Sequence, residues 1–238
     1  MRYTRRYNVV FAIGLGSTAG LGWIVGPWIE GGAAYPLTAA AFFAVLVAAV
    51  VRVAGAQHPH PRFGPANAVT MIRAMLAALA AALIGHPASP AVLWFVIGLT
   101  VLMAGLDGVD GWLARRTRMT SAYGARFDME TDAAFILVLA ILVWQHGKAG
   151  VWVLLCGLMR YAFVAAGWLL PWLAGPLRAT RRGRTVAAGQ LLGLGVALAP
   201  IVAAPVSAVA AAMTLAALAC SFAIDVIWLS RQVRTSEE

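Results

Sequence analysis

The sequence predicts an all-α fold, a polytopic membrane helical bundle of about eight transmembrane helices with both termini in the cytoplasm. Of the 238 residues, 62% are hydrophobic and only 11% are charged, and the mean hydropathy is +0.83. This composition lies outside the range of water-soluble domains. The apolar residues are grouped in runs of about 20, the length with which a helix crosses the hydrocarbon core. The basic residues are clustered between alternate runs, as expected for a membrane protein of fixed orientation.

Eight apolar runs are long enough to span a bilayer, and they lie at residues 8–29, 35–54, 67–85, 90–113, 129–146, 149–174, 185–203 and 206–230. The first run follows the basic start MRYTRR and resembles the apolar region of a signal peptide. It is long enough to span, so we expect it to be a retained anchor. Cys156 and Cys220 both lie within apolar runs, which argues against a disulfide framework and predicts core packing.

The net charge of +9 is explained by orientation, without a nucleic-acid partner. Apart from Arg160 and Lys148, the Lys and Arg residues lie at the two termini or within residues 52–73, 115–126 and 178–184. The positive-inside rule then places both termini and these connections in the cytoplasm, with Lys148 on the opposite side. We therefore expect a multi-pass protein of the cell membrane, that is of a bacterial inner membrane, whose partner is the lipid bilayer.

Four aspartates interrupt the apolar pattern, and they are Asp107, Asp110, Asp128 and Asp132. An ionised aspartate at the centre of a membrane helix costs about 2.5–3.5 kcal/mol, so four facing lipid would cost on the order of 10 kcal/mol. These side chains must therefore face water or cations.

Helical geometry places the aspartates of each helix on one face, so the four carboxylates can point toward the same space. At about 100° per residue, an arc of roughly 140° on the first helix holds Asp107, Asp110, Gly111, Ala114 and Arg115. On the second helix, the spacing i, i+4, i+8 places Gly124, Asp128 and Asp132 on one side. Two helices joined by the short polar link RTRMTSAY can thus aim four carboxylates at one another.

Carboxylate oxygens are the ligands of hard divalent cations, above all Mg²⁺. Two such ions about 3.5–4 Å apart would bridge the carboxylates and polarise a phosphoryl group. The small residues on the same faces would leave room for a ligand, and Arg115 could pair with a phosphate. Two alternatives stay open: interfacial aspartates paired with nearby arginines, and a carboxylate-lined metal or proton transporter. The transporter alternative explains neither the glycines nor Arg115.

The pattern D-x2-D-G-x2-A-R-x8-G-x3-D-x3-D, which runs from Asp107 to Asp132, resembles the signature of the CDP-alcohol phosphotransferase family, also called the CDP-alcohol phosphatidyltransferase family. A second family pattern, N-x2-T-x2-R, is similar to Asn67, Thr70 and Arg73. The resemblance implies a six-helix core at residues 63–232. Residues 1–62 would then be a two-helix N-terminal extension and 233–238 a cytoplasmic tail.

The resemblance also implies an activity. Members of the family transfer a phosphatidyl group, or a similar phosphoalcohol, from a CDP-linked donor such as CDP-diacylglycerol to a hydroxyl acceptor, and they release CMP. By likeness, the four aspartates would bind two divalent ions, Mg²⁺ or Mn²⁺, and Asp132 would also be the general base. The residues that would hold the CDP moiety are Asn67, Thr70, Gly111, Ala114, Arg115 and Gly124. Asn67 and Thr70 could instead form only a helix cap and its first turn. Relatives are commonly dimers, which suggests a homodimer.

Three arginines match family positions that bind the phosphate of an acceptor such as glycerol 3-phosphate, and they are Arg160, Arg182 and Arg184. A phosphorylated polyol acceptor is therefore expected, although residues 178–184 could serve orientation alone. Met129 and Tyr161 depart from the glycerophosphate-using pattern, so inositol phosphate, serine and choline stay open as acceptors. Glu130 is expected to face away from the metals, while Asp225 could pair with a basic residue or line the cavity.

Overall fold

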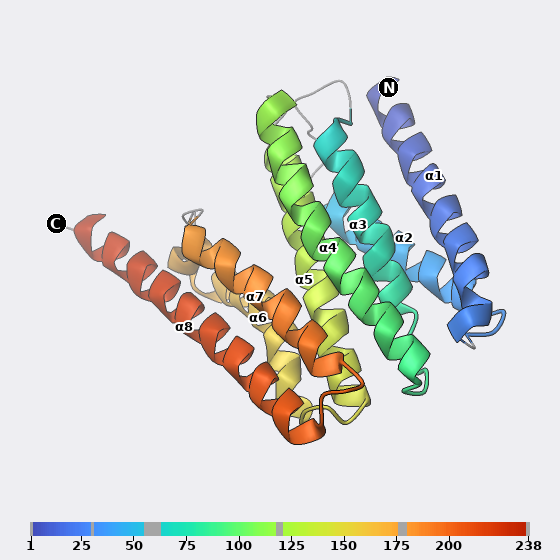
Figure 1. Ribbon diagram of the computed structural model, residues 1–238. Coiled ribbons are helices and arrows are strands. Elements are labelled where there is room, and N and C mark those ends of the chain that lie inside the picture. The colour runs from blue at the N-terminus through green and yellow to red at the C-terminus, as the bar shows by residue number, and fades with distance from the viewer. Residues whose placement is uncertain (1, 30, 55–62, 118–120, 176–179, 237–238) are drawn as a thin grey trace. The chain divides into compact units, whose positions relative to one another are not determined.

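The computed structural model describes residues 2–29, 31–54, 63–117, 121–175 and 180–236. Its described residues form only helices and turns, which confirms the predicted all-α fold (Figure 1). The elements are α1 (Arg2–Val25), η1 (Gly26–Ile29), α2 (Tyr35–Ala54), α3 (Pro65–Ala81), α4 (Pro90–Thr117), α5 (Ala122–Gln145), η2 (Val151–Leu154), α6 (Leu155–Leu169), η3 (Pro171–Ala174), α7 (Arg181–Leu198) and α8 (Ala204–Ser236), where η marks a 3-10 helix.

Each predicted apolar run corresponds to an α-helix, although the bounds of most helices differ by a few residues from the predicted ones, and two cases have a clear local cause. The run 149–174 is divided into η2, α6 and η3, and α6 ends next to Leu170, whose extended backbone is the conformation favoured before a proline. Helix α5 begins seven residues before the predicted 129. The hydroxyl of Ser121 accepts a hydrogen bond from Gly124 N at 3.0 Å and so caps this helix. The hydropathy pattern does not predict the first two turns of α5, because these turns include charged residues.

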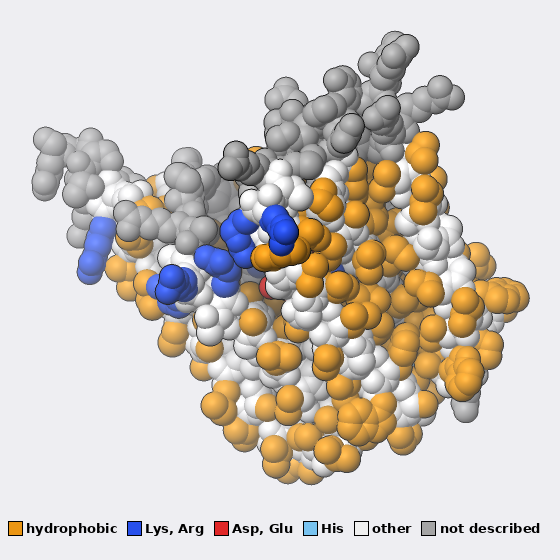
Figure 2. Space-filling model, turned by 45° about the horizontal axis from the view of Figure 1, so that its top comes forward, with side chains coloured by type: hydrophobic (Ala, Val, Ile, Leu, Met, Phe, Trp, Pro, Cys, Tyr) orange, Lys and Arg blue, Asp and Glu red, His pale blue; other side chains and the backbone are white. Residues whose placement is uncertain are grey.

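Five described segments are long and apolar enough to cross a membrane, and they are Val9–Ile29, Tyr35–Arg52, Pro90–Thr117, Val151–Leu169 and Ala204–Gln232. Helix α3 is apolar but shorter. Figure 2 shows hydrophobic side chains over much of the face that it draws, as expected for a surface in contact with lipid. The total of eight crossings and the cytoplasmic termini stay predictions.

The chain divides into two compact units, Met1–Val138 and Leu139–Glu238. In the first unit, α3 packs against α1, α2 and α4, and the buried core includes Phe43, Met71 and Phe127. The buried Tyr35 hydroxyl donates to the Leu79 carbonyl at 2.8 Å and so ties α2 to the last turn of α3. The predicted N-terminal extension thus packs on α3. Its predicted end at residue 62 lies outside the described residues, and the division 1–62, 63–232 and 233–238 stays a prediction.

In the second unit, α7 and α8 pack tightly against each other. A Cβ atom on Gly193 would lie 2.2 Å from Thr214 Cγ2, so only glycine fits there. The Gln190 amide donates to the Thr214 carbonyl at 3.1 Å. Cys156 is buried, as predicted, but Cys220 is exposed because it lies on a face of α8 away from this contact; both are free thiols.

Beyond the end of α7, the Lys148 ammonium group donates to two backbone carbonyls, those of Ala199 at 2.9 Å and Val202 at 2.7 Å. Carbonyls at the end of a helix lack intrahelical partners, and a cation there also interacts favourably with the helix dipole. Lys148 therefore closes the connection between α7 and α8.

In the first unit, α1 lies close to the backbone of α2 at Gly22. A Cβ atom at this position would lie 2.8 Å from the backbone Cα of Pro36, which cannot move aside as a flexible side chain could. On the same helix, a Cβ atom at Gly20 would meet nothing within 4 Å. The two glycines therefore form a matched pair that differs in packing alone.

We expect Gly22→Ala to lower the free energy of unfolding by about 1–3 kcal/mol, because the methyl group forces the two helices apart. Gly20→Ala is the control and should be neutral or stabilising by up to about 1 kcal/mol, since alanine has the higher helix propensity. Equilibrium unfolding in mixed detergent micelles measures both. Equal effects of the two changes would contradict the close contact between α1 and α2.

Candidate active site

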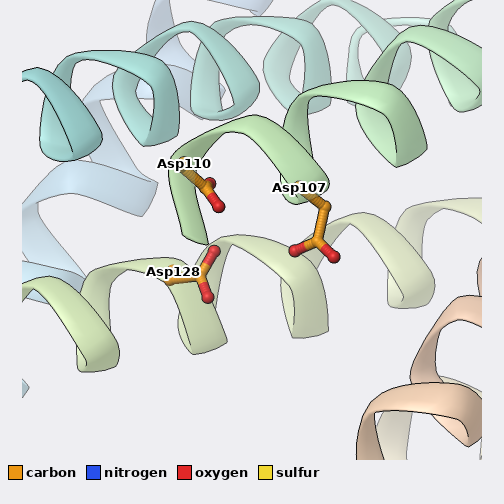
Figure 3. A group of neighbouring side chains, drawn as sticks. All are labelled: Asp107, Asp110 and Asp128. Carbon is orange, nitrogen blue, oxygen red and sulfur yellow. The ribbon is translucent and has the colours of Figure 1, made fainter. Parts of the chain in front are cut away.

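The predicted convergence of acidic side chains from α4 and α5 is confirmed. Asp107 and Asp110 extend from α4 and Asp128 from α5, and their carboxyl groups point into the same space (Figure 3). One oxygen of each lies within 4.8 Å of one oxygen of the other two. This spacing brings the three carboxylates within reach of one cation.

The Arg73 side chain of α3 connects all four aspartates. Its Nη1 atom donates to Asp110 and Asp128. Its Nη2 atom donates to Asp132 and lies 3.1 Å from Asp107 Oδ1. Each terminal nitrogen therefore bridges one carboxylate of α4 and one of α5.

This guanidinium is enclosed. Arg73 has a relative exposure of 0%, which is tolerated because the surrounding carboxylates compensate its charge. Its Nε atom is also buried but has no hydrogen-bond partner among the described residues. An unsatisfied buried donor costs about 1–3 kcal/mol, so the arrangement satisfies the charge of Arg73 better than its hydrogen bonding.

Exposure is graded across the acidic cluster. The side chain of Asp110 is 7% exposed, that of Asp132 30%, that of Asp128 38% and that of Asp107 50%. Asp110 therefore lies at the closed end and Asp107 at the open end. At the closed end, the Thr70 hydroxyl lies 3.2 Å from the Ala66 carbonyl and 3.5 Å from Asp110 Oδ2.

The donor set suits divalent cations. Every candidate ligand is a carboxylate oxygen, the ligand type that Mg²⁺ and Mn²⁺ prefer. Four ionised carboxylates against the single Arg73 guanidinium leave three negative charges uncompensated. Asp107 and Asp110 of α4 and Asp128 and Asp132 of α5 are the residues that would hold divalent ions. Asp107, Asp110 and Asp128 are the closest-grouped ligands, and Asp132 joins them through its shared contact with Arg73.

The small residues of the signature have different surroundings. A Cβ atom at Gly124 would lie 2.7 Å from Asn67 Oδ1 and 3.2 Å from Ser121 Oγ. The space expected to admit a ligand beside Gly124 is therefore filled by Asn67, because α3 packs on this side of α5. At Gly111, the nearest atom to an added Cβ would be Nη1 of the flexible Arg115, at 3.4 Å. Room for a ligand thus exists beside Gly111, and Ala114 is half-buried on the same helix.

Asn67 is not the cap of its helix. The cap of α3 is Gly64, whose φ of 77° lies in the left-handed region that favours glycine, and Pro65 follows as the first helical residue. Asn67 and Thr70 lie in the first two turns and are both buried. The structure therefore brings these two residues and Gly124 together with the aspartates, which the cap alternative does not explain.

The predicted acceptor residues lie in the second unit. Arg160 is half-buried on α6, and Arg184 is exposed in the first turn of α7. Arg182 pairs with Asp225 and also donates to the Ser221 hydroxyl at 3.2 Å and the Ser221 carbonyl at 3.4 Å. Of the two alternatives for Asp225, the structure thus favours pairing with a basic residue.

The contact between Arg73 and the aspartates is not among the predictions from the sequence. Arg73 is counted there with the basic residues that set orientation and matched to the pattern N-x2-T-x2-R, whereas the structure buries it inside the acidic cluster. A signal was present, because the spacing i, i+3, i+6 places Asn67, Thr70 and Arg73 within an arc of about 120° on one helix. A basic residue on the same face as two polar residues indicates a role inside the bundle.

Much of the chain is similar to known proteins. A family model described as CDP-alcohol phosphatidyltransferase matches residues 63–224. Ethanolaminephosphotransferase 1 of Homo sapiens is 32% identical over 104 residues, which cover 37% of this chain and 26% of that protein. CDP-diacylglycerol–glycerol-3-phosphate 3-phosphatidyltransferase of Cereibacter sphaeroides is 28% identical over 89 residues, which cover 37% of this chain and 40% of that protein.

These alignments span between about a quarter and two-fifths of the length of the relatives. No solved structure matches the chain. The matched region of the family model extends from the end of the second connection into α8 and contains all four aspartates and Arg73. Because this match covers well over half of the sequence, the chain belongs to the CDP-alcohol phosphatidyltransferase family.

Proposed function

We propose that this protein transfers a phosphatidyl group from CDP-diacylglycerol to an alcohol acceptor and releases CMP, a step of phospholipid biosynthesis. The observation that carries the proposal is the convergence of carboxylates from α4 and α5 on a position already held by a cationic group. Family membership supplies the reaction class. The transporter alternative has no comparable support.

In the proposed reaction, the acceptor hydroxyl attacks the phosphorus of the phosphatidyl group, and the bond to the oxygen of CMP breaks. Asp132 takes the proton of the hydroxyl, which is the role of a general base. Asp107, Asp110, Asp128 and Asp132 would hold two divalent ions, Mg²⁺ or Mn²⁺. When bound, these ions would stabilise negative charge on the phosphoryl oxygens and on the departing CMP.

The CDP moiety is proposed to bind beside the acidic cluster. On α4, the position of Gly111 leaves space for a ligand, and the exposed Arg115 can pair with a phosphate. Ala114 lies between them in sequence on α4. Asn67 and Thr70 would complete the site from α3, with Gly124 allowing Asn67 to approach.

The acceptor is proposed to be a phosphorylated polyol such as glycerol 3-phosphate, whose phosphate would bind Arg160, Arg182 and Arg184. The Cereibacter sphaeroides relative is named for this acceptor. Asp225 and Ser221 hold Arg182 from the side of α8 and would orient its guanidinium. Inositol phosphate, serine and choline are the alternative acceptors. We further propose that the active site faces the cytoplasm and that the protein forms a homodimer.

A second candidate is transfer of a phosphoalcohol from a CDP-alcohol to a lipid hydroxyl. The observation that favours it is the similarity to ethanolaminephosphotransferase 1. The same site residues would serve, because the bond that breaks is again the one between the transferred phosphorus and CMP.

Purified protein in liposomes should release CMP from CDP-diacylglycerol with Mg²⁺ or Mn²⁺ when glycerol 3-phosphate is added. A parallel assay with CDP-ethanolamine and diacylglycerol tests the second candidate, and inositol phosphate, serine and choline test the other acceptors. Failure to release CMP with every pair, together with uptake of metal ions or protons into the liposomes, would favour the transporter instead.

Asp132→Asn should lower the rate of CMP release at least about hundredfold, because it removes both the general base and a metal ligand. Glu130→Gln is the matched control, since Glu130 lies two residues from Asp132 on the same helix and is expected to face away from the metals. A steady-state assay at saturating donor compares the two. Retention of wild-type activity by Asp132→Asn would remove Asp132 from the mechanism.

Arg160→Gln and Arg184→Gln should each raise the KM for glycerol 3-phosphate by roughly tenfold, because each removes a charge-assisted hydrogen bond to the phosphate. The kcat should change far less. Arg231→Gln on α8 controls for the loss of one positive charge near the same membrane surface. If the KM for the phosphorylated acceptor were unchanged in both variants, the acceptor phosphate would bind elsewhere.

A further inference from the structure

We infer that Arg73 is an internal counter-ion, which occupies the acidic cluster when metal is absent and must give up carboxylate oxygens when divalent ions enter. The inference rests on the proposed metal-dependent function of the same site. The role of Arg73 is that of a positioning residue, because it acts through its contacts with the aspartates and not through contact with substrate.

Arg73 occupies part of the ligand set that a metal would use. Its terminal nitrogens contact one oxygen of each of the four aspartates, and carboxylate oxygens are the ligands that these residues offer to a metal. A carboxylate oxygen in close contact with a guanidinium nitrogen has no room for a cation at the same place. Arg73 and divalent ions therefore compete for one set of ligands.

The charge of Arg73 also affects how many divalent ions the cluster can hold. When all four carboxylates are ionised, the cluster with Arg73 in place carries three negative charges, because four aspartates surround one guanidinium. One divalent ion would leave one negative charge, and a second would make the cluster positive. Without the guanidinium, two divalent ions neutralise four carboxylates. Since like charges a few Å apart repel strongly where water is scarce, Arg73 weakens metal binding, above all of the second ion.

Arg73 also holds α4 and α5 together when no metal is bound. Four carboxylates facing one another would repel, whereas each terminal nitrogen of Arg73 bridges these two helices. The carboxylates compensate the charge of Arg73 but not its full hydrogen-bonding capacity, because the buried Nε atom lacks a partner among the described residues. A guanidinium held in this way is suited to be displaced by ions that bind the carboxylates better.

The test is Mn²⁺ binding to purified protein without substrate, in nanodiscs of zwitterionic lipid, followed by electron paramagnetic resonance. Arg73→Gln should bind Mn²⁺ at least about tenfold more tightly than the wild type, because it removes the competing charge. Thermal unfolding in EDTA should occur at a lower temperature for this variant, and added Mn²⁺ should raise that temperature more than it does for the wild type.

Two variants make the comparison specific. Arg116→Gln removes the same charge from the end of α4, where Arg116 stacks over Trp112 at 4.9 Å, and should leave the Mn²⁺ affinity nearly unchanged. Asp110→Asn removes a ligand and should weaken Mn²⁺ binding. If Asp110→Asn bound Mn²⁺ as the wild type does, the ion would lie elsewhere, and both the proposed metal site and this inference would fail.

If the wild type binds Mn²⁺ through Asp110 but Arg73→Gln binds it equally or more weakly, the counter-ion role alone is overturned. If Arg73→Gln does not fold, Arg73→Lys decides the question. Lysine keeps the charge but offers a single nitrogen, so it can hold fewer of the four carboxylates. This variant should bind Mn²⁺ more tightly than the wild type, and equal or weaker binding would overturn the inference.

Discussion

Carboxylates that face one another inside an apolar helical bundle require a cation, because neither lipid nor a neighbouring apolar helix can compensate their charge. The guanidinium of Arg73 supplies one such cation within the chain itself. Because Arg73 belongs to α3, its contacts with the four aspartates join α3 to both α4 and α5. This charge contact is added to the packing of α3 against α4.

The arrangement also explains why small residues recur around the site. Gly124 allows the Asn67 side chain to lie against α5, and this approach brings the first turns of α3 beside the aspartates. Gly111 has a different role, because the space beside it is limited only by a flexible arginine. Within one signature, Gly124 thus allows two helices to pack closely, whereas Gly111 leaves space for a ligand.

The sequence predicted the helices and the acidic cluster because both depend on local periodicity. The facing of Asp107 and Asp110 toward Asp128 followed from helical spacing and a short link. The partners of Arg73 could not be read in the same way, since they lie between 34 and 59 residues away along the chain. Contacts at such separations depend on how helices pack, and no local pattern encodes that packing.

The same limit applies to the second unit, where Arg182 and Asp225 are 43 residues apart. From the sequence, Arg182 could either set the membrane orientation or bind a phosphate. Asp225 could either pair with a basic residue or line the cavity. The ion pair shows that Arg182 is already engaged by an acidic residue of the neighbouring helix α8. Counts of basic residues alone therefore overstate the positive charge that is available to an anionic ligand.

Lys148 illustrates a conflict between two requirements on one side chain. The predicted orientation places it across the bilayer from the other basic clusters, where a positive charge opposes insertion of the chain in the correct sense. Its hydrogen bonds to Ala199 and Val202 nevertheless close the polar backbone beyond α7. In the predicted orientation, the positive charge of Lys148 would disfavour correct insertion of the chain into the membrane. The same charge stabilises the folded connection between α7 and α8, so the two requirements on this side chain are opposed.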